Sequence, residues 1–103
     1  DSGVSALGYG CSLMRAAARV DHNQAAIVSA LRQVGAMVCI LSSVGRGCPD
    51  LLVGYHGMNY LLEVKAEKGR LTRQETEWIQ TWAGQVRIVR SVIGACAAIG
   101  IQV

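Results

Sequence analysis

Two carboxylates and a lysine stand at a spacing that could support phosphodiester hydrolysis. Asp50 directly precedes an apolar run, residues 51–53, and both Glu63 and Lys65 lie in a second run, residues 60–65. Because side chains alternate between the two faces of a strand, Glu63 and Lys65 point to the same side. Two acids and a lysine at one edge of a sheet are what a metal-dependent phosphodiesterase requires. A strand with one solvated face is the simpler explanation of the Glu-x-Lys tripeptide alone.

The segments beside these residues favour the first explanation. Residues 44–50 lead tightly into a short strand, residues 51–54, and the sequence Tyr55-His56-Gly57-Met58 is typical of a hairpin turn. The turn folds the next strand, residues 59–65, back beside the first. The acids are therefore expected to meet at one edge of a sheet.

The chain before this hairpin predicts a helix and a strand. Asp21 at an N-cap, with Gln24 three residues later, makes a capping-box-like pair, and Gly35 supplies the stop. Apolar residues at helical spacing lie between them. The apolar segment 37–41 then predicts the first strand.

A helix, a strand and a final helix are expected after the hairpin. Thr72 and Glu75 form a capping box at the start of a helix that Gly84 closes, and residues 86–89 predict a strand. The final helix, residues 91–99, is apolar nearly all round. Such a helix is usually covered on more than one side, which indicates a partner subunit.

These elements follow in the order αβββαβα, which defines one α/β domain over residues 21–103. Residues 1–20 are rich in Gly, Ser and Ala and are expected to form a loosely ordered N-terminal arm. With 103 residues, 51% of them apolar, the chain can build one modest core. No apolar run approaches the ~20 residues that a membrane span needs, so no membrane partner is expected.

Cysteine usage and net charge limit the cellular compartment and the functions that the sequence allows. The four cysteines are scattered without a CxxC pair, which argues against a zinc site or a disulfide framework and favours a reduced, cytoplasmic location. Cys39 and Cys96 lie in apolar runs and are predicted to be buried, and Cys48 is expected to pack rather than to act as a nucleophile. A net charge of +3 is by itself poor support for nucleic-acid binding.

The distribution of the basic residues is more informative than their number. Arg46 lies just before the Pro-Asp sequence, and Lys68, Arg70 and Arg73 follow Lys65 closely. These positions flank the proposed site, where phosphate contacts would be useful. An ordinary solvated loop is the alternative explanation.

Residues 45–54, followed by residues 62–65, resemble the PD-(D/E)xK nuclease superfamily, and in particular its VRR-NUC branch of small domains found alone in phages or fused to larger repair enzymes. The likeness extends outward from residues 21–24 to residues 87–91. It implies a restriction-endonuclease-like αβββαβ core, in which a small central mixed sheet is flanked by helices.

The resemblance also implies the site residues and the cofactor. Asp50, Glu63 and the Val64 carbonyl would hold Mg²⁺, for which Mn²⁺ could substitute, and no organic cofactor is expected. The cation would lower the pKa of a bound water and polarise the scissile phosphate. Lys65 would orient that water or stabilise the developing negative charge. The flanking basic residues, Arg46 and Lys68 first among them, would hold neighbouring phosphates.

This chain departs from the family at the first helix. Many relatives carry an acid there that completes the metal site, and the matching position in this chain is Ala26. Asp21 could substitute, although the helix cap is its simpler role. Gln24 could reach the site as a neutral ligand or hydrogen-bond donor and is counted among the catalytic residues, although it too has a capping explanation. Relatives also carry a glutamine early in the second helix, for which Gln74 is the candidate.

Three conspicuous side chains have structural explanations. Trp78 and Trp82 lie four residues apart and share a helix face with Ile79, so they are expected in the core rather than as a base-stacking platform. His56 lies in the hairpin turn and is expected to have no catalytic role.

Three functions follow from these observations. The first is a Mg²⁺-dependent endonuclease for junction, flap or branched DNA. By analogy with the family, it would be encoded by a phage or prophage and would work as a homodimer. The second is a nuclease-fold module that binds DNA without efficient turnover, supported by the missing first-helix acid. The third is a structural α/β domain, which predicts a melting temperature indifferent to Mg²⁺ or Mn²⁺.

Overall fold

The computed structural model describes residues 23–102, which form an α/β domain with a four-stranded mixed sheet and three helices. The strands, in their order across the sheet, are β1 (Met37–Ile40), β2 (Leu51–Tyr55), β3 (Met58–Val64) and β4 (Arg87–Val89). β1, β2 and β3 are antiparallel, whereas β4 runs parallel to β3. The expected N-terminal arm, residues 1–20, lies outside the described residues.

Three helices accompany the sheet: the first helix, residues 23–33, then α2 (Arg73–Thr81) and α3 (Val92–Ala98). The predicted order αβββαβα is therefore confirmed. The expected helix start at Asp21 lies outside the described residues. None of the helices within residues 23–102 is both long and apolar enough to cross a membrane.

The β2–β3 hairpin is set by a two-residue turn. His56 and Gly57 both have positive φ, at 49° and 81°, and this backbone twist matches that of the flanking strands. The turn fixes a register in which Leu51 is opposite Leu62 and Leu52 is opposite Leu61. The parallel pairing of β3 with β4 needs a crossover connection, and α2 lies within it.

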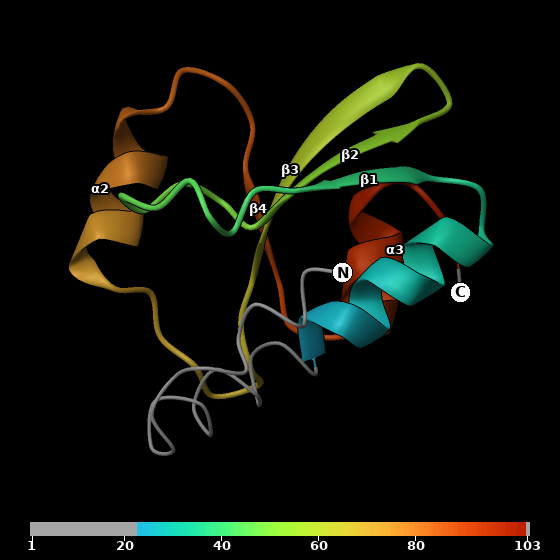
Figure 1. Ribbon diagram of the computed structural model, residues 1–103, viewed down its shortest axis with the longest axis horizontal. Helices are drawn as coiled ribbons and strands as arrows, with labels where there is room; N and C mark the ends of the chain where they lie inside the picture. The colour runs from blue at the N-terminus through green and yellow to red at the C-terminus, as the bar shows by residue number, and fades with distance from the viewer. Residues whose placement is uncertain (1–22, 103) are drawn as a thin grey trace.

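The core lies on one face of the sheet, beneath the first helix and α3 (Figure 1). Alternate residues of the hairpin point to this face and are at most 1% exposed, namely Leu51, Val53, Leu62 and Val64. Each buried side chain of this size contributes about 1.5–3 kcal/mol. The same alternation turns Asp50, Leu52, Leu61 and Glu63 to the opposite face.

α2 stands apart from the other two helices (Figure 1) and buries none of its residues. Its start is held by the predicted capping box, in which the Glu75 N–H donates to the Thr72 hydroxyl at 3.1 Å and the Thr72 N–H donates to the Glu75 carboxylate at 2.8 Å. Gly47 lies directly against the backbone of Gln74. The loop before β2 and the first turn of α2 therefore fix each other.

One expectation about burial needs correction. Cys39 is exposed, although Cys96 is buried as predicted. β1 is an edge strand, and Cys39 pairs with Leu52, so its side chain lies on the sheet face that carries no core helix. Among residues 23–102, α3 is covered on one face, and Ile93 on its other side is 65% exposed. A partner subunit over its other side remains a prediction.

Gly47→Ala is expected to destabilise the fold more than the matched change Gly45→Ala. Both glycines have φ near +80°, at 83° and 77°, so each alanine costs about 1–2 kcal/mol for its left-handed conformation. Only the added Cβ at Gly47 would collide with the Gln74 carbonyl, which should add about 1–3 kcal/mol. Urea unfolding of the two variants measures the difference. Equal losses would show that the loop and α2 do not constrain each other.

Candidate active site

The hairpin register places the two predicted carboxylates across from one another. The last pair of the ladder joins Leu51 to Leu62, so the next residues outward, Asp50 and Glu63, lie opposite each other on the face away from the core. Both the backbone and the side chain of Asp50 are held by hydrogen bonds. Its backbone carbonyl accepts from the Leu41 N–H at 2.7 Å, and its carboxylate Oδ2 accepts from the Val64 N–H at 2.9 Å.

Glu63 is the most unusual ionisable group of the described residues. It is 1% exposed, and its Oε1 atom has no hydrogen-bond partner. The pKa of Glu63 is raised to about 8, first by burial and then by the neighbouring charges of Asp50 and Glu75, while Lys65 opposes the shift. A nearby positive charge would favour the ionised form of this acid, and Lys65 provides only part of it.

Lys65 lies between two carboxylates on the same side of β3. Its ammonium is 2.7 Å from Oε1 of Glu75 and 3.7 Å from Oε2 of Glu63. Its backbone carbonyl accepts from the Asn23 side chain at 3.1 Å, which ties the end of β3 to the first helix. Lys65 is thus fixed in both main chain and side chain.

Glu75 both caps the start of α2 and pairs with Lys65 in the site. Burial alone would raise its pKa, but hydrogen bonds from Lys65 and from the Thr72 N–H outweigh that effect and lower the pKa. Glu75 is therefore ionised, and its carboxylate pairs with the Lys65 ammonium at 2.7 Å. The capping role predicted for Glu75 is confirmed, and the contact with Lys65 is an additional role that the capping pattern did not predict.

The first helix reaches the site through Gln24. Gln24 is 9% exposed, and its Nε2 donates to the Ser42 hydroxyl at 3.2 Å. That hydroxyl has a single proton, which it donates either to Oδ1 of Asp50 at 3.5 Å or to Oε1 of Gln24 at 3.3 Å. Gln24 is thus linked to Asp50 through Ser42, and its role as a ligand or donor in the site remains a prediction. Ala26 is exposed, so the helix position nearest the acids is Gln24 and not Ala26.

The Val64 carbonyl points toward the same site. The Lys65 N–H donates to Val89 of β4 at 3.0 Å, and the carbonyl of the same planar peptide unit must point the opposite way. The Val64 carbonyl therefore points to the side of β3 on which the Asp50 carboxylate accepts from the Val64 N–H. The Val64 carbonyl and the Asp50 carboxylate therefore lie on the same side of β3, and their joint role with Glu63 as cation ligands remains a prediction.

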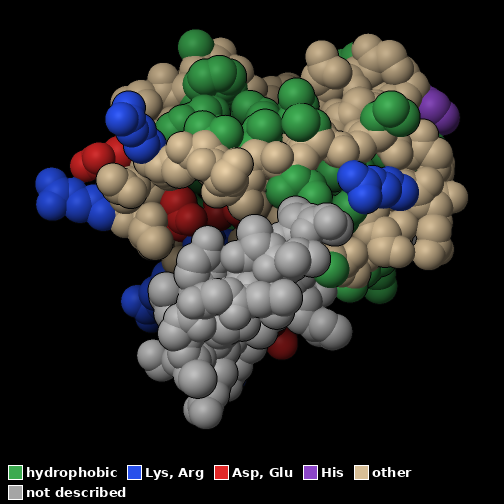
Figure 2. All heavy atoms as spheres, viewed as in Figure 1, with side chains coloured by type: hydrophobic (Ala, Val, Ile, Leu, Met, Phe, Trp, Pro, Cys, Tyr) green, Lys and Arg blue, Asp and Glu red, His purple; other side chains and the backbone are tan. Residues whose placement is uncertain are grey.

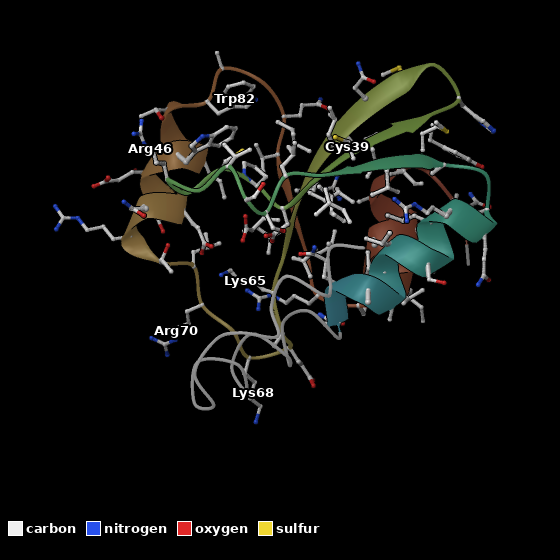
Figure 3. The ribbon with its side chains drawn as sticks, in the orientation of Figure 1. Cys39, Arg46, Lys65, Lys68, Arg70 and Trp82 are labelled. Atoms are coloured by element: carbon white, nitrogen blue, oxygen red, sulfur yellow. The ribbon has the colours of Figure 1, made fainter. Side chains whose placement is uncertain are left out.

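The basic residues are not gathered into one patch (Figure 3). Arg46 lies beside α2, whereas Lys68 and Arg70 lie on the segment between β3 and α2. Arg73 is exposed and pairs with Glu77 at 3.2 Å. The residues predicted to contact phosphates therefore lie in separate places, Arg46 beside α2 and Lys68 and Arg70 before it, with Lys65 between them.

Arg90 organises the segment that carries Lys68. Its guanidinium donates to the carbonyls of Ala66, Glu67 and Gly69 at distances of 2.6 to 3.3 Å. Residues 87–91 belong to the family likeness, but no local pattern marked Arg90 as the anchor of this loop. Ser42 and Asn23 were likewise missed, because their partners are far away in sequence.

The two tryptophans are not core residues, which corrects the prediction. Trp82 is 47% exposed, and its ring stacks on that of Trp78 with centroids 4.4 Å apart and planes 18° from parallel. Together they line an apolar groove beside the acids. Figure 2 shows hydrophobic side chains gathered on this part of the molecule.

Cys48 borders the groove and carries no sign of a nucleophile. It is half-buried, and burial raises the pKa of its thiol, with further increases from the charges of Glu63 and Asp50. A raised pKa keeps the thiol protonated and unreactive. The packing role predicted for Cys48 agrees with this environment.

The donor atoms present suit a hard divalent cation. Among residues 23–102 there is no group of three or more His, Cys, Asp or Glu side chains placed as metal ligands. The ligands that the resemblance implies are two carboxylates and one carbonyl, all oxygen, and Mg²⁺ prefers oxygen ligands and keeps several waters. The unpartnered Oε1 of Glu63 is an atom that such a cation would satisfy. The residues therefore fit Mg²⁺.

Comparison of the chain with family models, with curated proteins and with solved structures finds no match. The assignment of the site therefore depends on its geometry.

Glu63→Gln is expected to change how stability depends on pH. Because the pKa in the fold is about 8 and its ordinary value is 4.5, the stabilising contribution of Glu63 is fully present below pH 4.5 and is lost as the pH rises through about 8. The variant lacks this titration. Relative to the unchanged chain, it should gain about 1–3 kcal/mol in free energy of unfolding between roughly pH 5 and pH 9.

Urea unfolding without divalent cations at the two pH values measures this gain. Glu67→Gln, at an exposed position, is the matched control and should show little gain. A Glu63→Gln difference that is the same at both pH values would contradict the account of the buried acid.

Proposed function

We propose that this domain is a Mg²⁺-dependent DNA endonuclease with a restriction-endonuclease-like core of the PD-(D/E)xK type. The observation that carries the proposal is the buried Glu63 beside the half-buried Asp50, with Oε1 of Glu63 left without a partner among the described residues. Burying an acid next to a second acid costs free energy, so a fold is expected to keep this arrangement only where a ligand compensates that cost. The order of elements and the convergence of the Val64 carbonyl support the same reading.

The cofactor and its ligands follow from the donor set. Asp50, Glu63 and the Val64 carbonyl would hold Mg²⁺ or Mn²⁺. When bound, the cation would supply Lewis-acid chemistry, lowering the pKa of a water molecule and polarising the scissile phosphate. Because Glu63 is protonated at neutral pH without a cation, binding would release its proton.

The chain's own residues would orient the reactants and stabilise charge. The Lys65 ammonium would stabilise the negative charge that develops on the phosphate in the transition state. Glu75 acts as a positioning residue, since its carboxylate at 2.7 Å holds the Lys65 ammonium in place. On the other side, the Val64 N–H and the Ser42 hydroxyl hold the two oxygens of Asp50, and Gln24 supports Ser42.

Branched or otherwise distorted DNA is the proposed substrate. The net charge of +3 and the separate groups formed by Arg46 on one side and Lys68 and Arg70 on the other suit contacts with phosphates on both sides of the cut. Such contacts position DNA without reading its sequence. The domain would act as a homodimer on two strands of a junction. Its location would be the cytoplasm of a bacterium or of a phage-infected cell.

A second function is supported by the neutral side chain on the first helix. Many PD-(D/E)xK nucleases carry an acid on this helix, at the position predicted to match Ala26, whereas here the side chain that approaches Asp50, through Ser42, is Gln24. One fewer negative charge should weaken cation affinity. The domain would then bind DNA without efficient turnover.

Cleavage of supercoiled plasmid and of a labelled four-way junction, with Mg²⁺ or Mn²⁺, tests the first function against the second. The unchanged chain should cut, and Glu63→Ala should lose all measurable cutting. Lys65→Ala should lose about 100-fold or more in rate while DNA affinity, measured in Ca²⁺, stays within a few fold. Met58→Ala, at a 57% exposed position in the hairpin away from the acids, is the control and should keep most of the rate. Cation-dependent binding without any cutting would establish the binding module instead.

A further inference from the structure

We infer that the apolar groove beside the acids binds one unpaired nucleobase of the DNA substrate, adjacent to the phosphate that is cut. This inference rests on the proposed function, because it takes the phosphate to lie at Asp50 and Glu63. It assigns a binding role to Trp78 and Trp82.

The groove and the acids share one face of the hairpin. Asp50 and Glu63 form one cross-strand position, and Leu52 and Leu61 form the next position on the same side. Two residues along a strand span about 6.6 Å. A phosphate at the acids would therefore place the base of an adjoining nucleotide over the leucine pair.

The shape and lining of the groove suit a flat aromatic ring. Leu52 of β2 and Leu61 of β3 line the groove together with the stacked Trp78 and Trp82. The volume of the groove is about 470 Å³. Small-molecule sites commonly have volumes of about 300–1,000 Å³. Trp82, labelled in Figure 3, is held in place by close contact with Gly84, where an added Cβ would lie 2.8 Å from the indole nitrogen.

Two amide side chains point to a ligand with hydrogen-bonding edges. Asn59 and Gln85 also line the groove, and each amide offers both donors and an acceptor. An aliphatic ligand would leave these groups without partners. A nucleobase offers one apolar face for the indoles and polar edges for the amides.

The geometry also restricts the form of the DNA. A base inside a duplex has both faces covered by its neighbours, so only an unpaired base can enter the groove and stack. This requirement favours flaps, single-stranded ends and branch points over intact duplex.

Intrinsic fluorescence reports on the groove directly, because Trp78 and Trp82 are the two tryptophans of the chain. The unchanged chain in EDTA is titrated with a short oligothymidylate and with an abasic oligonucleotide of the same length and charge. We expect quenching by oligothymidylate at a concentration about tenfold lower than that needed for the abasic strand. Equal quenching curves, or no change with either strand, would overturn the inference.

Substitutions identify the residue responsible. By anisotropy of a labelled oligothymidylate, Trp82→Ala should weaken binding about tenfold and Trp82→Phe should keep most of the affinity, because a phenyl ring still stacks. Ile93→Ala, at an exposed position on α3, is the control and should bind normally. If Trp82→Ala does not fold, as judged by circular dichroism, the abasic comparison on the unchanged chain decides the question.

The outcomes separate the groove from the nuclease proposal. Cation-dependent cutting with no preference for a base would overturn the groove assignment and leave the nuclease intact. Base-dependent binding without cutting would support the groove and remove the nuclease. A dimer that dissociates in Trp82→Ala, with no preference between the two strands, would assign the groove to a second copy of the chain and overturn the inference.

Discussion

The structure depends on one costly arrangement, the placement of Glu63 in a buried position opposite Asp50. The hairpin register forces the two acids together, because it is fixed by the turn and by the buried leucines on the other face. Shifting the register by one residue would relieve the acids but would turn Leu51 and Leu62 out of the core. Core packing therefore imposes the carboxylate pair, and the hydrogen bond from the Val64 N–H to Asp50 holds it in a fixed geometry.

The sheet face that carries the acids is divided into a polar end and an apolar end. The polar end holds the carboxylates and Lys65, and the apolar end holds the groove lined by Trp78 and Trp82. α2 spans both, since Glu75 in its first turn contacts Lys65 and its last turns carry the tryptophans. One short helix that buries none of its residues thus completes both parts of the surface, and its position depends on the contact between Gly47 and the helix start.

Local patterns in the sequence predicted much of this arrangement. Strand alternation placed Glu63 and Lys65 on one side, and the hairpin turn brought Asp50 to them, because both effects depend only on neighbouring residues. The Thr72–Glu75 capping box and the order of elements were predicted for the same reason. The exposure of Cys39 and of Trp82 was not predicted, because it depends on which faces the helices cover in three dimensions. The link through Ser42 joins segments far apart in the chain, and no local pattern encodes it.

The most direct test of the central claim is a crystal structure of the protein soaked in Mn²⁺, with anomalous diffraction used to locate the ion. The account predicts one strong anomalous peak within coordination distance of Asp50, Glu63 and the Val64 carbonyl, which would satisfy the oxygen of Glu63 that has no partner among residues 23–102. A saturating soak that shows no peak there, or peaks only at other carboxylates, would contradict the claim that this acid pair is a cation site.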